Sequence, residues 1–181
     1  MFGRNFLILF VFYIPYHWFI VFSRAILPIH LLNESITQQQ MFLGIFLGFI
    51  GQLSLFFVLK SMSAKLSWYL SLLTIAVYIL LVISIKNASQ FYIASFINGM
   101  SLFFFYIFYN IAHFKNTAKT EIGRSSALMF AGPGIISIFA PLAAGYFAQI
   151  NITLLWILSF LSFFISLYLA NLQTDFHLSW N

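Results

Sequence analysis

The chain is built from long stretches of apolar residues that are almost free of charge. Six such runs follow one another, each about 20 residues long or longer, and short polar segments separate them. A bilayer core about 30 Å thick needs about 20 apolar residues in an α-helix that rises about 1.5 Å per residue. The runs therefore predict six transmembrane helices, at residues 6–32, 41–59, 68–85, 91–114, 126–149 and 152–172.

The composition agrees with a chain that lies in lipid. Hydrophobic residues make up 62% of the sequence and charged residues 6%, whereas a soluble domain carries about 25% charged residues. The strands of a membrane β-barrel would alternate apolar and polar residues over about 10 positions, and these runs are continuously apolar. We therefore expect an all-α membrane protein whose first run is too long to be a cleaved signal peptide.

The positive charges predict the orientation, because Lys and Arg accumulate on the cytoplasmic side of a membrane. A cytoplasmic N-terminus leaves only Lys86 and Arg24 on the outer side. Six basic residues then lie on the cytoplasmic side: Arg4, Lys60, Lys65, Lys115, Lys119 and Arg124. Both termini are expected inside, with residues 173–181 as a cytoplasmic tail. Topology accounts for the net charge of +5, and we expect no nucleic-acid partner.

The sequence offers no pattern that is typical of enzymes or metal proteins. It has no Cys, and its four His include no pair at i, i+4, so we expect neither a thiolate site nor any other metal site. It also lacks a nucleophile beside a base and a glycine-rich phosphate loop. We therefore expect no enzyme, no catalytic residue and no cofactor. The acidic residues all lie outside the runs: Glu34, Glu121 and Asp175.

The fifth run is unusually rich in Gly, Ala and Pro for a helix. Small residues let membrane helices approach closely, and a proline bends a helix by removing one hydrogen bond. We expect a packing face with a hinge, formed by Gly132, Pro133, Gly134, Ala140, Pro141, Ala144 and Gly145. Gly and Pro are also simply commoner in membrane helices, and this alternative stays open for Pro133. In the second run, Gly44, Gly48 and Gly51 likewise indicate helix packing.

One motif resembles a known family of transporters. The segment APLAAG, residues 140–145, resembles the Gly-Pro-x-x-Gly-Gly motif in the fifth helix of the major facilitator superfamily, with Ala at two glycine positions. Gly123 and Arg124 lie where many members carry a Gly-Arg pair. Six runs and a cytoplasmic N-terminus are also similar to the N-terminal half of that family. The loop KSMSAKLSW keeps Lys60 and Lys65 but lacks the Gly and Asp of the family's loop motif.

Polar residues on two runs form the candidate site. On the first run, Tyr13 and His17 share a helical face with Arg24, and Tyr16 lies beside them. On the fourth run, a similar face holds Ser95, Gly99, Tyr106, Asn110 and His113. The resemblance implies that these two helices line a central cavity. We therefore expect the substrate cavity to include Tyr13, Tyr16, His17, Asn98, Tyr106 and Asn110. For residues near helix ends, His113 above all, an interfacial aromatic belt is the alternative.

The resemblance implies a secondary active transporter that moves a small solute by alternating access. Members of the family have two six-helix halves with the site between them. We therefore expect this chain to be a truncated piece, or to pair with a second six-helix half or with itself, in the plasma membrane. The alternative is a six-helix scaffold or assembly subunit that transports nothing. Transport predicts that Tyr13, His17, Asn98 and Asn110 contact water, whereas a scaffold predicts that they are dry.

Overall fold

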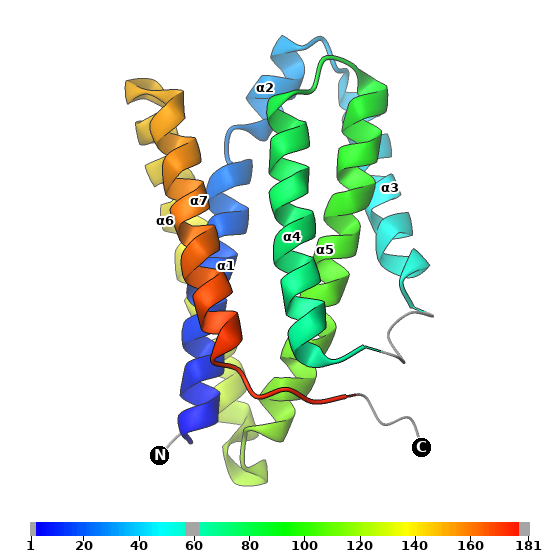
Figure 1. Cartoon of the computed structure of the whole chain (residues 1–181). Helices are drawn as coiled ribbons and strands as arrows, with labels where there is room; N and C mark the ends of the chain where they lie inside the picture. Colours follow the sequence, from blue (N-terminus) through cyan, green and yellow to red (C-terminus); the bar gives the residue numbers. More distant parts are fainter. Residues whose placement is uncertain (1–2, 57–61, 178–181) are drawn as a thin grey trace. The chain divides into compact units, whose positions relative to one another are not determined.

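The computed structural model describes residues 3–56 and 62–177, and most of these residues are helical (Figure 1). Within them there is no β-strand, and Ser63 and His177 form an isolated β-bridge. A short 3₁₀ turn, η2, occupies Lys119–Glu121. The α-helices are α1 (Arg4–Arg24), α2 (Leu27–Asn33), α3 (Gln38–Ser54), α4 (Ala64–Ile83), α5 (Ala88–Lys115), α6 (Ile122–Ile150) and α7 (Ile152–Asn171).

The helices match the predicted runs closely. Five stretches of the described chain are long and apolar enough to cross a membrane: Arg4–Asn33, Ala64–Ile83, Ala88–Lys115, Lys119–Ile150 and Ile152–Asn171. The second run corresponds to α3, which has 17 residues, and its last residues, 57–59, lie outside the described residues together with Lys60. The all-helical, membrane-compatible class is confirmed, whereas the orientation in the membrane stays a prediction.

The first predicted run is divided into two helices. α1 ends at Arg24, and α2 begins at Leu27. Pro28 explains this break, because it has no N–H to donate to the carbonyl of Arg24 and its ring crowds that carbonyl. The run therefore holds a long helix and a short one.

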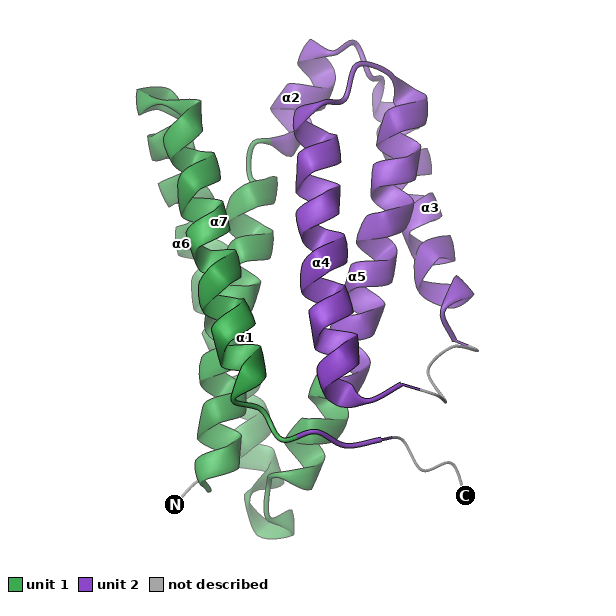
Figure 2. Ribbon diagram, in the orientation of Figure 1, with its two compact units in different colours: residues 1–26, 109–174 green, residues 27–108, 175–181 purple. Residues whose placement is uncertain are grey.

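The described chain forms two compact units (Figure 2). Unit 1 comprises residues 1–26 and 109–174, and so contains α1, α6 and α7 together with the last residues of α5. Unit 2 comprises residues 27–108 and 175–181, and so contains α2, α3, α4, most of α5 and the part of the tail that begins at Asp175.

In unit 2, α3 and α5 meet backbone to backbone. A Cβ atom added to Gly99 of α5 would overlap with the carbonyl group of Gly48, and one added to Gly51 would overlap with the carbonyl oxygen of Phe96. A Cβ on Gly48 would lie 3.2 Å from the carbonyl oxygen of Ser95. The glycines of α3 therefore form the packing face that the sequence indicates, and α5 supplies a glycine of its own at the closest point.

Buried serines join α4 to α5 in the same unit. The hydroxyl of Ser67 donates to the carbonyl of Phe104 at 2.6 Å, and that of Ser71 donates to the carbonyl of Ser101 at 2.7 Å. Both serines are fully buried. Hydrogen bonds of this kind supply association energy between helices in lipid, where the hydrophobic effect gives none.

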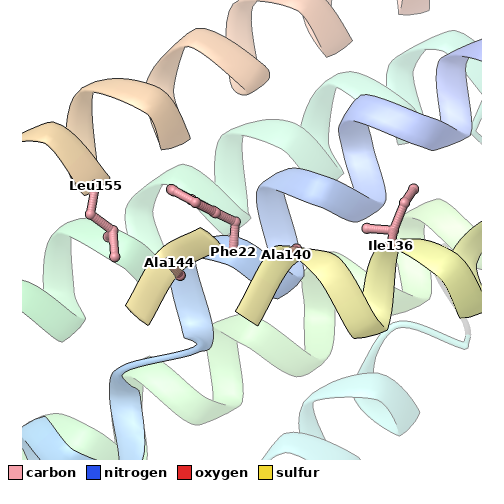
Figure 3. Close-up of a cluster of buried hydrophobic side chains, with 5 residues drawn as sticks. All are labelled: Phe22, Ile136, Ala140, Ala144 and Leu155. Carbon is pink, nitrogen blue, oxygen red and sulfur yellow. The ribbon is translucent and has the colours of Figure 1, made fainter. Parts of the chain in front are cut away.

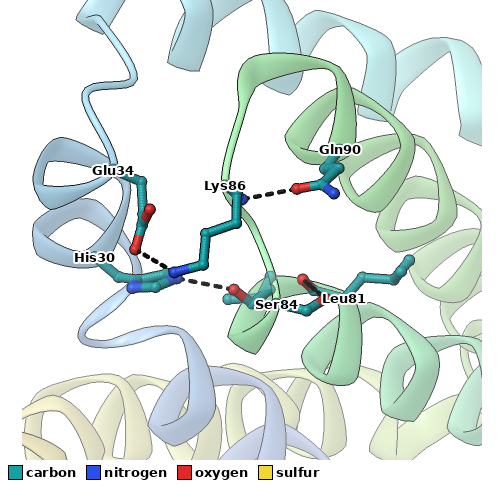
Figure 4. A network of polar contacts seen from close by, with 7 residues as sticks. His30, Glu34, Leu81, Ser84, Lys86 and Gln90 are labelled. Carbon is teal, nitrogen blue, oxygen red and sulfur yellow. Dashed lines mark hydrogen bonds and ion pairs between the residues drawn. The ribbon is translucent and has the colours of Figure 1, made fainter.

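A second polar group in unit 2 joins the loop after α2 to the loop after α4 (Figure 4). The ammonium group of Lys86 donates to Glu34 at 3.0 Å, and the N–H of Lys86 donates to the side chain of Gln90 at 2.7 Å. His30 Nε2 donates to the carbonyl of Val82 at 3.0 Å. The side chain of Lys86 is 70% exposed, so its ion pair contributes little to stability.

In unit 1, α1 packs against both α6 and α7. Phe22 of α1 lies in a cluster with Ile136, Ala140 and Ala144 of α6 and Leu155 of α7, and all five are buried (Figure 3). The alanines leave room for the large ring of Phe22. Ile136 and Leu155 complete the cluster around the ring of Phe22.

The buried face of α7 is lined by serines. Ser159, Ser162 and Ser166 are all buried, and each donates its hydroxyl to the carbonyl four residues earlier, at 2.8, 3.0 and 2.8 Å respectively. The helix therefore satisfies its own polar side chains. What remains is a narrow surface of small residues, which suits the close packing of α7 against α1.

α6 runs without interruption through Pro133 and Pro141. Ala140 and Ala144 are fully buried, and a Cβ added to Gly132 would lie 3.1 Å from the ring of Phe10. By contrast, the space around Gly134 and Gly145 is open, with nothing within 4 Å of an added Cβ. The small residues of α6 therefore do not all take part in packing within the chain, and the hinge at Pro141 stays a prediction.

Candidate functional site

Two histidines and two tyrosines share one region of unit 1. Tyr13 and His17 lie four residues apart on α1, with ring centroids 5.4 Å apart. Tyr109 and His113 lie four residues apart on the last turns of α5. The ring of Tyr13 is 4.6 Å from that of Tyr109, which joins the two pairs. We call these four residues the ring column. Tyr13, Tyr109 and His113 are buried.

α6 provides a polar partner for three members of the ring column. Ser125 bonds to His113 Nε2 at 2.9 Å, Ser137 bonds to His17 Nε2 at 3.1 Å, and the sulfur of Met129 accepts from the hydroxyl of Tyr109. The three partners are spaced by four and eight residues. α6 therefore contacts the column at several turns along its length.

Ser125 makes a second hydrogen bond besides the one to His113. Its hydroxyl donates to the carbonyl of Ile122 at 3.0 Å. His113 is in this way held as a buried structural group, and its ring also lies 6.0 Å from that of Phe6.

His17 has a hydrogen-bond partner on only one of its two ring nitrogens among the described residues. It lies near the middle of α1, about 20 Å along the helix from Arg4 at about 1.5 Å per residue. Its Nδ1 atom is buried and has no hydrogen-bond partner among the described residues, whereas Nε2 faces Ser137, which is exposed. Arg24 lies seven residues further along α1, on the same face of the helix as His17. Ionisable groups inside a membrane are costly, and they are usually retained for function.

The candidates on α5 divide between the two units. Asn98 and Tyr106 are half-buried and belong to unit 2, whereas Asn110 is exposed and belongs to unit 1. The carbonyl of Asn98 accepts the hydroxyl of Ser101 at 2.7 Å. Neither Asn98 nor Tyr106 shares a unit with His17. The face predicted from Ser95 to His113 is also mixed, because Ser95 and Gly99 pack against α3.

The remaining candidates have distinct surroundings. Tyr16 is fully buried, with its ring 6.3 Å from that of Phe12. Gly123 has no neighbour within 4 Å of an added Cβ, and Arg124 is exposed. The N–H of Lys65 donates to Asp175 in the tail. None of these residues belongs to the ring column.

Sequence reasoning missed the contribution of α6 to this region. Ser125 and Met129 lie one helical turn apart, but Ser137 lies about 120° around the helix from Ser125 at 3.6 residues per turn, so the three do not form a simple one-face pattern. Among the described residues no three His, Cys, Asp or Glu side chains gather in a way that could hold a metal ion.

The arrangement can bind a proton or hydrogen-bond a polar solute at His17, next to the rings of the column. Comparison with protein-family models, with curated proteins and with solved structures finds no match for this chain.

Proposed function

We propose that this chain is a secondary active transporter for a small solute in the plasma membrane. It acts as one six-helix bundle, together with a second bundle or a second copy of itself. The resemblance to the major facilitator superfamily supports this proposal through Ala140, Pro141, Ala144 and Gly145, and through the Gly123–Arg124 pair. Helices long and apolar enough to cross a membrane are compatible with it.

The observation that carries the proposal is the pair formed by His17 and Ser137. Both residues lie near the middle of long apolar helices. Polar and ionisable side chains are costly at that depth of a membrane and are usually retained for function. The imidazole has one nitrogen buried and the other bonded to an exposed serine. A group in that position can exchange a proton or a hydrogen bond with a solute. Helix packing alone does not require it.

The scaffold alternative draws on unit 2. There Ser95 and Gly99, which the sequence places on a polar face of α5, pack against α3, and Ser67 and Ser71 bond directly to the backbone of α5. These polar residues join helices, as a scaffold requires. The two proposals therefore differ at His17: transport requires that His17 contact water, whereas a scaffold requires that it be dry.

The test is transport by the purified full chain in lipid vesicles. Vesicles are exposed to a mixture of labelled sugars, amino acids, peptides and drugs, and the solutes retained inside are measured. We expect at least one solute to accumulate beyond the level of protein-free vesicles. His17→Ala should lower that accumulation about tenfold, equivalent to about 1.4 kcal/mol, because the polar pair is lost.

His30→Ala is the matched control, since His30 bonds to the carbonyl of Val82 in unit 2, and we expect it to transport normally. The amount of inserted protein is measured for every variant. Equal accumulation by wild type and His17→Ala would remove His17 from the site. A wild-type chain that accumulates nothing, alone or mixed with a second bundle, would favour the scaffold.

A further inference from the structure

The tail that follows α7 is seated on the first turn of α4 within unit 2. The carbonyl of Phe176 accepts the N–H of Ala64 at 2.8 Å, and a carboxylate oxygen of Asp175 accepts the N–H of Lys65 at 3.0 Å. His177 forms the isolated antiparallel bridge with Ser63. Three consecutive tail residues therefore bind the start of one helix.

These bonds complete the capping of α4. The first N–H groups of an α-helix have no partner within the helix. In α4, the N–H of Leu66 donates to the hydroxyl oxygen of Ser63 at 3.3 Å. The N–H groups of Ala64 and Lys65 depend on the tail. A carboxylate is also favoured there by the positive end of the helix dipole.

Aromatic contacts fix the position of the tail. The ring of Phe176 lies 6.4 Å from that of Trp68 in an edge-to-face arrangement, and 5.9 Å from that of Phe108. Trp68 and Phe108 are both almost fully buried, whereas Phe176 is half-buried. The end of α4 thus offers two N–H donors and, beside them, an aromatic surface.

We propose that this end of α4 is a recognition site for a short extended peptide segment with a carboxylate followed by an aromatic side chain. The chain's own residues 175–177 occupy it as a clasp that can be released. Asp175 and His177 are exposed, so an acid or a competing peptide can reach the contacts. The clasp does not require that the chain transport a solute.

The clasp is expected to depend on pH. Partial burial raises the pKa of Asp175, but the N–H of Lys65, the hydroxyl of Ser63, the N–H of Phe176 and the charge of His177 together hold it below its ordinary value. A lowered pKa means that the charged carboxylate is stabilised by the bound state. The clasp is therefore complete above the ordinary pKa of an aspartate and weakens as the pH falls through the lowered pKa.

Disulfide formation in the full chain tests the clasp. The pair Ser63→Cys and His177→Cys replaces the two residues of the bridge, whose backbone spacing suits a disulfide. The natural sequence contains no Cys, so no other thiol reacts. We expect rapid oxidation to a disulfide within one chain. The control pair, Ser63→Cys with Ser35→Cys, has α3 between its members and should not form a disulfide.

Release is tested in the same variant. Adding Phe176→Ala should slow disulfide formation about tenfold, and so should an excess of a synthetic Thr-Asp-Phe-His peptide, whereas a Thr-Asn-Ala-His peptide should have no effect. A disulfide that forms only between two chains, or not at all, would overturn the clasp. Failure of the peptide to compete would overturn its role as a recognition site.

Hydrogen exchange provides a measurement that needs no Cys. In the wild-type chain the amides of Ala64 and Lys65 should be protected at neutral pH. In Asp175→Asn, Lys65 should exchange about tenfold faster, since a hydrogen bond to a charged group is lost. Equal exchange in the two proteins would contradict the clasp even if a disulfide variant failed to fold.

Discussion

Replacing Gly99 with alanine is expected to separate α3 from α5 and to destabilise unit 2 by about 1–3 kcal/mol, the usual range for overpacking. The added methyl group would overlap with the carbonyl group of Gly48, which is backbone and cannot rotate away. The helices must therefore move apart. That movement also loosens the contact of Gly51 with Phe96. Thermal unfolding of the purified chain in mild detergent measures the loss.

Gly134→Ala is the matched control for this substitution. It makes the same chemical change inside α6, where nothing lies within 4 Å of the new methyl group. Because alanine favours a helix by up to about 1 kcal/mol over glycine, we expect Gly134→Ala to be at least as stable as the wild type. If Gly99→Ala melted at the same temperature as Gly134→Ala, the close approach of α3 and α5 would be disproved.

Phe22→Ala is expected to be the most damaging single change in unit 1. Phe22 is fully buried between α6 and α7, where its ring lies against Ile136, Ala140, Ala144 and Leu155. Truncating a buried Phe costs about 3–5 kcal/mol in proteins. In a bilayer the loss comes from missing packing contacts rather than from contact with water, so the lower end of that range is expected. The same unfolding experiment measures it.

Phe130→Ala provides the comparison, because Phe130 is 80% exposed on α6. Its ring faces the surroundings of the chain rather than another helix of unit 1. We expect its removal to change stability by less than about 0.5 kcal/mol, as is usual for surface positions. Similar losses at Phe22 and Phe130 would show that the cluster in Figure 3 does not hold the unit together.

The helices themselves could be predicted from the sequence. A continuous apolar run that is long enough to cross a membrane has few alternatives to an α-helix, because its backbone groups must bond to one another in lipid. The break after Arg24 was missed, although Pro28 signals it, since composition alone does not distinguish one long helix from two. The glycines of α3 were correctly interpreted as a packing signal. Their partner, Gly99, was instead assigned to a polar face, because spacing shows which residues share a face but not what lies opposite.

The candidate site was predictable only in part, for the same reason. The spacing of Tyr13 and His17 on one face is a local property of α1. Their neighbours Tyr109 and Ser137 come from segments roughly a hundred residues away, and a single sequence does not report such distances. Asp175 was counted only as an acid outside the membrane. Its role on α4 depends on a backbone N–H, a group that every residue except proline carries.

The most direct test of the transport account is the accessibility of position 17 to water. His17→Cys is introduced into the chain, and a membrane-impermeant thiol reagent is applied from each side of the membrane. Leu9→Cys is the dry control, because Leu9 is fully buried in α1. The account predicts that position 17 reacts from at least one side and that position 9 does not. A thiol at position 17 that stays as unreactive as the control from both sides would contradict the account.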